Sequence, residues 1–115
     1  IVGEKKEPLT VSGDYGRLRQ MFLVVLDNAV KFTPPGGEVR VALEGRTVTV
    51  RDSGPGIAPE DAPYIFDRFY KAQSAGNAGG TGLGLAIAKQ IAERHGVKLS
   101  AENAPEGGAV FRFEF

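Results

Sequence analysis

The sequence predicts a single α/β domain in which helices cover one face of a mixed β-sheet. Apolar residues recur at helical spacing in two long segments, 15–32 and 83–95. Runs of alternating apolar and polar residues lie between these segments and after them, and each pair of runs is joined by turn residues. Long helices interleaved with hairpins favour a two-layer α/β sandwich, with about three helices on one face of the sheet.

The first half of the chain predicts strands, a long helix and a hairpin, in that order. Residues 1–14 mix charges with short β-prone runs, which indicates one or two strands and leaves Asp14 as a favourable N-cap. The helix over 15–32 ends at the TPPGG stretch, because proline and glycine stop helices. The runs EVRVALE and RTVTVRD, joined around Gly45, then predict a β-hairpin.

The second half predicts a short helix, a mobile loop, a second long helix and a final hairpin. The loop SGPGIAPED leads into a short helix near 59–65, and residues 66–82 are polar, rich in glycine and alanine, and without periodicity. The helix over 83–95 ends at Gly96, a favourable residue just after a helix. VKLSAEN and AVFRFEF, joined by PEGG, predict the last two strands.

Composition excludes several classes of function. Lys plus Arg and Asp plus Glu number 14 each, so net charge gives no argument for nucleic-acid or membrane-surface binding. The chain has no cysteine and one histidine, which excludes disulfides, thiolate metal sites and histidine clusters. Its apolar runs are shorter than the roughly 18 residues that a membrane span needs. A chain of 115 residues suits one domain, and a start at Ile1 leads us to expect a fragment of a longer protein.

Glycines cluster where the second long helix begins, in GNAGGTGLGLAIAKQ. The stretch does not match a P-loop, because Leu85 and Ala86 follow the last glycine, and its GxGxG spacing is not the GxGxxG of dinucleotide sites. Bare backbone at a helix N-terminus nevertheless favours an anion. The alternatives are a flexible linker or a tight contact between helix and sheet. On the first interpretation, the phosphate cradle comprises Gly80, Thr81, Gly82, Leu83 and Gly84.

The end of the first long helix carries a second candidate group. Asn28, Lys31 and Phe32 share one flank of this helix, beside its apolar stripe. An amide oxygen is a hard, neutral ligand that suits Mg²⁺, and a neighbouring lysine can pair with phosphate. The alternative is that Asn28 is a polar residue at the edge of the core and Lys31 is a solvated surface residue.

A third candidate is the carboxylate of Asp52, at the predicted end of a strand and followed by Gly54 and Gly56. One interpretation is a turn closed by the aspartate side chain. The other is a carboxylate beside a backbone that a flat ring can approach closely, since glycine adds no side chain.

Together these pieces resemble the catalytic, ATP-binding domain of two-component sensor histidine kinases, in the superfamily of gyrase-type ATPases, Hsp90 and mismatch-repair ATPases. LDNAVKFT resembles the family's N box, DSGPGI its first glycine box, IFDRFYK its F box and GGTGLGLAI its second glycine box, in that order; GGAVFRFEF resembles its terminal strand. The resemblance implies a Bergerat-type two-layer α/β sandwich with a mobile ATP lid over about residues 67–82.

The resemblance also implies roles for individual residues. Asn28 and Lys31 would be the catalytic pair, with Asn28 as ligand of Mg²⁺ and Lys31 at a phosphate. Asp52 would accept a hydrogen bond from the adenine 6-amino group, which predicts that ATP binds better than GTP. The full set implied to contact the nucleotide is Asn28, Lys31, Phe32, Asp52, Gly54, Gly56, Ile57, Tyr70, Lys71, Gly80, Thr81, Gly82, Leu83, Gly84 and Leu85.

The implied function is transfer of the γ-phosphoryl of Mg-ATP to a histidine on a separate dimerisation domain, for signalling to a response regulator. His95 is not expected to be the acceptor, because it ends a helix and no acceptor-like sequence surrounds it. Val24 stands where ATP-hydrolysing and serine-kinase relatives carry a glutamate base, and valine cannot activate a hydroxyl or water. The alternatives are an ATP hydrolase or serine kinase of the same superfamily, or a non-catalytic nucleotide-sensing module.

The expected setting follows from the same resemblance. The chain, residues 1–115, would be one cytoplasmic domain of a parent protein, including one anchored in the inner membrane. It would contact neither nucleic acid nor the membrane itself. The isolated domain would be monomeric, because the family dimerises through helices outside it.

Overall fold

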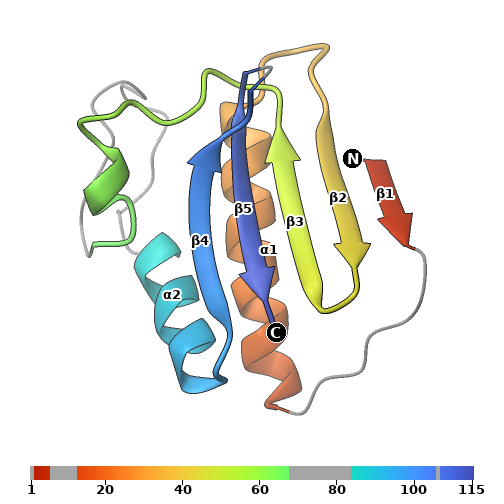
Figure 1. The fold of residues 1–115 in the computed structure, drawn as a ribbon, viewed down its shortest axis with the longest axis vertical. Helices are drawn as coiled ribbons and strands as arrows, with labels where there is room; N and C mark the ends of the chain where they lie inside the picture. Colours follow the sequence, from red (N-terminus) through yellow and green to blue (C-terminus); the bar gives the residue numbers. More distant parts are fainter. Residues whose placement is uncertain (1, 6–12, 68–83, 106) are drawn as a thin grey trace.

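A five-stranded mixed sheet forms one layer of the protein (Figure 1). The computed structural model describes residues 2–5, 13–67, 84–105 and 107–115. The strand order is β1-β2-β3-β5-β4, with β1 parallel to β2 and the other three pairs antiparallel. The strands are β1 (Val2–Lys5), β2 (Val39–Glu44), β3 (Thr47–Asp52), β4 (Lys98–Asn103) and β5 (Ala109–Glu114).

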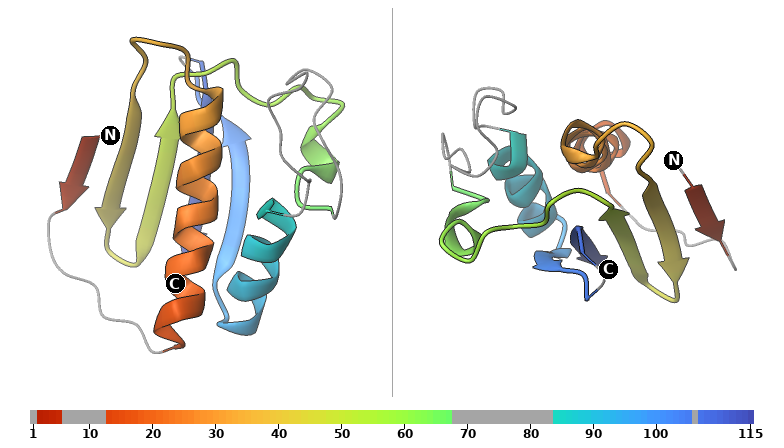
Figure 2. Two further views of the ribbon diagram at one scale, coloured as in Figure 1. Left: turned by 180° about the vertical axis from the view of Figure 1, so that it is seen from behind. Right: turned by 90° about the horizontal axis from the view of Figure 1, so that it is seen from above.

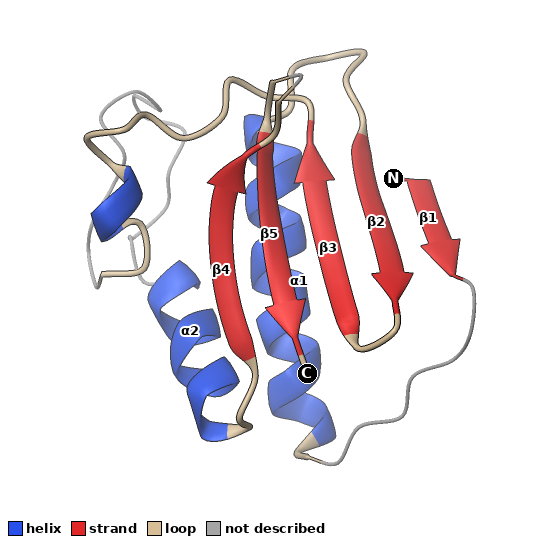
Figure 3. Ribbon diagram, in the orientation of Figure 1, coloured by secondary structure: helices blue, strands red, loops and turns tan. Residues whose placement is uncertain are grey.

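Two α-helices, α1 (Tyr15–Phe32) and α2 (Gly84–Arg94), lie on the same face of this sheet (Figure 2). Helix α1 begins where predicted, because the Asp14 carboxylate accepts a hydrogen bond from the Arg17 amide at 3.1 Å. It ends at Thr33, whose hydroxyl donates to the carbonyl of Ala29 at 2.8 Å. Figure 3 shows both helices behind the strands, so no helix among the described residues lies over the opposite face of the sheet.

The core lies between the helices and the sheet. Helix α1 buries the apolar stripe predicted from its spacing, and β5 alternates buried and half-buried residues along its length. Phe113 of β5 is fully buried, and its ring lies 4.7 Å from that of Phe22. The largest fully buried side chains are Phe113, Met21, Leu99, Val25, Val50 and Asp61.

Both predicted hairpins are confirmed, and Gly45 adopts the left-handed conformation (φ 59°) between β2 and β3. Gly96 does the same (φ 69°) after α2. The short helix expected near 59–65 is a single 3-10 turn, η1 (Ala62–Tyr64), with a proline in its first turn. The expected mobile loop falls mainly in residues 68–83, outside the described residues. Within the described ranges, no helix has both the length and the apolar character needed to cross a membrane.

The single histidine links the two helices at their lower ends. His95, just after α2, accepts a hydrogen bond at Nε2 from the Asp14 amide, 3.1 Å away. Its Nδ1 lies 2.9 Å from the carbonyl oxygen of Ile91, so the ring proton sits on Nδ1 and is donated to that carbonyl. The side chain is therefore already engaged in holding the start of α1 against the end of α2.

Candidate functional site

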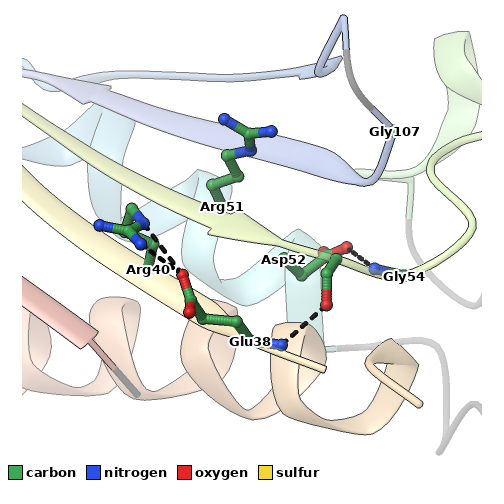
Figure 4. A pocket seen from close by; sticks show the side chains of 7 residues that line it. Glu38, Arg40, Arg51, Asp52, Gly54 and Gly107 are labelled. Carbon is green, nitrogen blue, oxygen red and sulfur yellow. Dashed lines mark hydrogen bonds and ion pairs between the residues drawn. The ribbon is translucent and has the colours of Figure 1, made fainter. Parts of the chain in front are cut away.

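Asp52 is a buried carboxylate at the end of β3, with 5% of its surface exposed. It shares the inward face of the strand with Val48 and Val50, because side chains alternate along β3. Its Oδ1 accepts a hydrogen bond from the backbone amide of Gly54 at 2.9 Å (Figure 4) and another from the amide of Ala109 at 3.2 Å. Within the described residues Oδ2 has no hydrogen-bond partner. The turn predicted at Asp52 is therefore present, and it uses only one of the two carboxylate oxygens.

Glycines let three backbone segments approach Asp52 closely. A side chain on Gly54 would run into the carbonyl oxygen of Phe32, the last residue of α1. Gly108 is buried at φ 82°, and a side chain there would run into the carbonyl oxygen of Asp52. The end of α1, the loop after β3 and the turn before β5 therefore meet at this carboxylate, with no side chain to separate their backbones.

Asn28 lies on the flank of α1 that faces α2. One turn earlier on this flank is Val24, and a Cβ on Gly84, the first residue of α2, would lie 3.3 Å from its Cγ1. Asn28 is half-buried, and its side chain forms no hydrogen bond with the described residues. It lies between the α1–α2 contact and the end of α1 that touches Gly54. The structure thus gives this amide oxygen a sheltered position with no partner in the described part of the chain.

Lys31 has an intramolecular partner. Its Nζ lies 3.2 Å from Asp27 Oδ2, with about half of the lysine side chain exposed. An exposed pair of this kind contributes only about 0.3–0.5 kcal/mol. A bound anion would displace it at little cost.

The structure brings some of the expected site residues together and leaves others undescribed. Phe32, Asp52 and Gly54 are in one cluster, Ile57 is half-buried against the core, and Gly84 and Leu85 begin α2. Among the described residues, no group of three or more His, Cys, Asp or Glu side chains could hold a metal ion. The expected residues outside the described ranges are Tyr70, Lys71, Gly80, Thr81, Gly82 and Leu83.

Two residues that support the site were not identified from the sequence. Gly108 packs on the Asp52 backbone, and Asn103, at the end of β4, binds both the amide and the carbonyl of Ile57. In sequence both belong to a hairpin turn, where Asn and Gly are common because they readily adopt the backbone conformations of turns. Their presence there therefore gave no sign of a role in the site. Only the left-handed Gly108 could have been anticipated, from its place next to a predicted strand.

A separate cavity of about 510 Å³ opens on the face of the sheet opposite α1 and α2 (Figure 4). Arg40 and Arg51, which lie opposite each other on β2 and β3, line it together with Glu38. Arg40 forms an ion pair with Glu38 at 2.6 Å. The cavity is also lined by Asp52 and Gly54. It therefore adjoins the candidate site, whose other residues lie on the helix-covered side of the sheet.

The comparisons with known proteins agree with this architecture. A family model described as "Histidine kinase-, DNA gyrase B-, and HSP90-like ATPase" matches residues 13–115. The chain therefore belongs to this ATPase family.

Within the family, its relatives are sensor histidine kinases. Sensor histidine kinase YkoH of Bacillus subtilis (strain 168) is 44% identical over 114 residues, which cover 96% of this chain and 25% of that protein. The solved structure of the mycobacterial sensor histidine kinase MprB has a TM-score of 0.87 and 37% identity, covering 97% of this chain and 80% of that one.

The structure of full-length ShkA in complex with AMPPNP has a TM-score of 0.78 and 36% identity, covering 98% of this chain and 24% of that one. The chain spans about a quarter of the length of the curated relatives it matches. It corresponds to the ATPase domain of these sensor kinases.

Proposed function

We propose that this chain binds Mg-ATP and transfers the γ-phosphoryl group to a histidine on a separate dimerisation domain of its parent protein. The observation that carries the proposal is the Asp52 carboxylate, which is buried among glycines, held by two backbone amides through Oδ1, and left with Oδ2 for a ligand. A desolvated acceptor with one oxygen fixed and one uncommitted suits an exocyclic amino group. The membership in an ATPase family and the AMPPNP complex of ShkA support adenine as its source.

The position of Asp52 would distinguish the two purine bases. Adenine offers a 6-amino donor to Oδ2, whereas guanine offers an oxygen there, which would face the carboxylate acceptor to acceptor. Leaving a buried acceptor unpaired costs about 1–3 kcal/mol, which predicts that ATP binds about tenfold or more tightly than GTP. Gly54 and Gly56 would let the backbone reach the ring.

The phosphates would lie between Asn28 and the start of α2. Mg²⁺ keeps several waters and takes few protein ligands when phosphate oxygens complete its shell. A single uncommitted amide oxygen at Asn28, with no acidic cluster in the described part of the site, fits this kind of magnesium binding. The amides in the first turn of α2 and the Lys31 ammonium would offset the remaining phosphate charge. Tyr70, Lys71, Gly80, Thr81, Gly82 and Leu83 would complete the nucleotide contacts.

Val24 favours phosphoryl transfer over hydrolysis. It is half-buried, and its methyl group packs towards Gly84, so position 24 offers no group that could deprotonate a water or a hydroxyl. A neutral imidazole is itself a good nucleophile and needs no such base. The acceptor would therefore be a histidine, and the downstream partner a response regulator in a two-component pathway.

The domain would act as one cytoplasmic unit, residues 1–115, of a longer sensor protein. In isolation it would be monomeric, and the acceptor histidine and the dimer contacts would both lie in the dimerisation domain of the parent. His95 is excluded as acceptor because both of its ring nitrogens are engaged with backbone groups.

The test combines this chain with the histidine-bearing domain of its parent and measures phosphoryl transfer from γ-labelled ATP. Asn28→Ala should lower the rate at least about tenfold, because a lost metal ligand leaves the phosphate charge unbalanced. ATP binding without magnesium should be unchanged in this variant. Gln20→Ala, two turns earlier on α1, is the matched control and should transfer normally. Undiminished transfer by Asn28→Ala would contradict the metal assignment.

A further inference from the structure

We propose that Asn103 is a positioning residue that fixes the depth and selectivity of the base pocket, an inference that rests on the proposed nucleotide function. Its carboxamide binds both backbone groups of Ile57: Oδ1 accepts from the Ile57 amide at 2.6 Å, and Nδ2 donates to the Ile57 carbonyl at 2.8 Å. Only one orientation of the amide satisfies both groups. The side chain thus pairs with the Ile57 backbone through one acceptor and one donor, as a neighbouring strand would. Ile57 is the last residue of the segment 53–57, which we call the base loop.

The base loop is shaped to lie directly on this amide. Gly56 has φ 83°, and a Cβ built on it would lie 2.7 Å from Asn103 Oδ1 and 3.4 Å from the carbonyl oxygen of Gly108. Both the left-handed backbone and the lack of space require glycine at this position. The loop is therefore held at its far end by Asn103, and at its near end by the amide of Gly54 on Asp52.

The same hairpin holds both walls of the pocket. Asn103 on β4 is the cross-strand partner of Ala109 on β5. The Ala109 amide donates to Asp52 Oδ1 at 3.2 Å, whereas Asn103 holds Ile57. Two directly paired residues therefore set the distance between the carboxylate that would read the base edge and the backbone that would lie along the ring.

This arrangement predicts a local effect on recognition and a small effect on folding. Asn103 is exposed, and hydrogen bonds that water can replace contribute little to global stability. Without the amide, residues 55–57 would lose their hydrogen bonds to β4 and be held mainly by the packing of Ile57 against the core, so the backbone beside the base could adopt several positions. Binding would then weaken for a base that depends on an exact edge contact, while contacts to the phosphates would stay intact.

The experiment uses Asn103→Ala and Asn103→Asp, with Ala101→Gly on the same strand as a control that weakens β4 without touching the loop. Calorimetry measures the affinities for Mg-ATP, Mg-GTP and magnesium tripolyphosphate, which has no base. Hydrogen exchange measures protection of the Ile57 amide.

We expect Asn103→Ala to weaken ATP binding about 5- to 30-fold, the range for two partly exposed hydrogen bonds. The ATP-to-GTP preference should fall by a similar factor, with tripolyphosphate affinity unchanged and Ile57 protection reduced about tenfold or more. Asn103→Asp, which keeps one acceptor but turns an oxygen towards the Ile57 carbonyl, should fall between Asn103→Ala and the wild type.

Parallel losses for all three ligands, or the same pattern in Ala101→Gly, would overturn the proposal, because a structural role alone produces them. If the wild-type chain bound tripolyphosphate but bound ATP no more tightly than GTP, the proposed recognition of adenine would be wrong, and so would the role of Asn103. That outcome is distinct because it is visible before any variant is made.

Discussion

Replacing Asp52 by asparagine tests the proposed base recognition most directly, because the structure dictates how the new amide must lie. Two backbone amides, those of Gly54 and Ala109, point at Oδ1. An NH₂ group at that position would face two donors, so the amide oxygen must take it and the NH₂ group must replace Oδ2. A donor then faces the base where an acceptor stood.

The magnitudes follow from this exchange. ATP loses a hydrogen bond to a charged group, which contributes about 1.5–3 kcal/mol, and gains a clash between donors. ATP affinity should therefore fall about 10- to 150-fold. GTP loses its acceptor clash and gains a neutral hydrogen bond, so the ATP-to-GTP ratio should change by about 30-fold or more towards GTP.

Calorimetric titration of the isolated chain with both nucleotides measures these changes, and a thermal melt shows whether the variant is folded. Glu60→Gln removes an exposed carboxylate after the base loop and serves as the control. If Asp52→Asn kept its ATP affinity within about twofold, or lost ATP and GTP in parallel, Asp52 would not read the base.

Two further predictions concern the framework that holds the site. Gly108→Ala should destabilise the domain by about 3 kcal/mol, because it combines a left-handed backbone with a clash against the Asp52 carbonyl, whereas Gly45→Ala, left-handed but with open space, should cost about 1 kcal/mol. Equal urea midpoints for the Gly108→Ala and Gly45→Ala variants would contradict the proposed clash at Gly108. His95→Ala should cost about 1–2 kcal/mol, because it removes the hydrogen bond from the Asp14 amide at the start of α1 and the one to the Ile91 carbonyl within α2. Arg94→Ala, one residue earlier, should be near neutral in the same assay.

Local patterns in the sequence predicted most of the fold. The helical stripe of α1 and the alternation in β5 are periodic features of a single segment, and each was buried as expected. The short helix before Phe66 was overestimated, because prolines within a few residues leave room for only one 3-10 turn. Phe66 itself packs edge-on against Phe111 at 6.1 Å, a contact between segments that no local pattern contains.

The candidate site divides in the same way. Asp52 and Asn28 became site candidates through their places in the DSGPGI and LDNAVKFT motifs, because the residues alone also fitted a turn and a polar residue at the edge of the core. The supports of the site did not stand out: Asn103 lies 46 residues from Ile57, and Ala109 lies 57 residues from Asp52. An alanine amide carries no chemical signature in a sequence, since every residue except proline has one.

The sequence by itself thus determined which segments are helices and strands, and which side chains are candidates for the site, since both depend on spacing and residue type within a few turns of the chain. Only the tertiary structure decided that β5 inserts between β3 and β4. That strand order places the β4–β5 hairpin beside the end of β3, where its backbone orients the Asp52 carboxylate and its Asn103 side chain holds the loop. Strand order depends on long-range pairing, and the free energy of that pairing comes from the whole core rather than from any one segment.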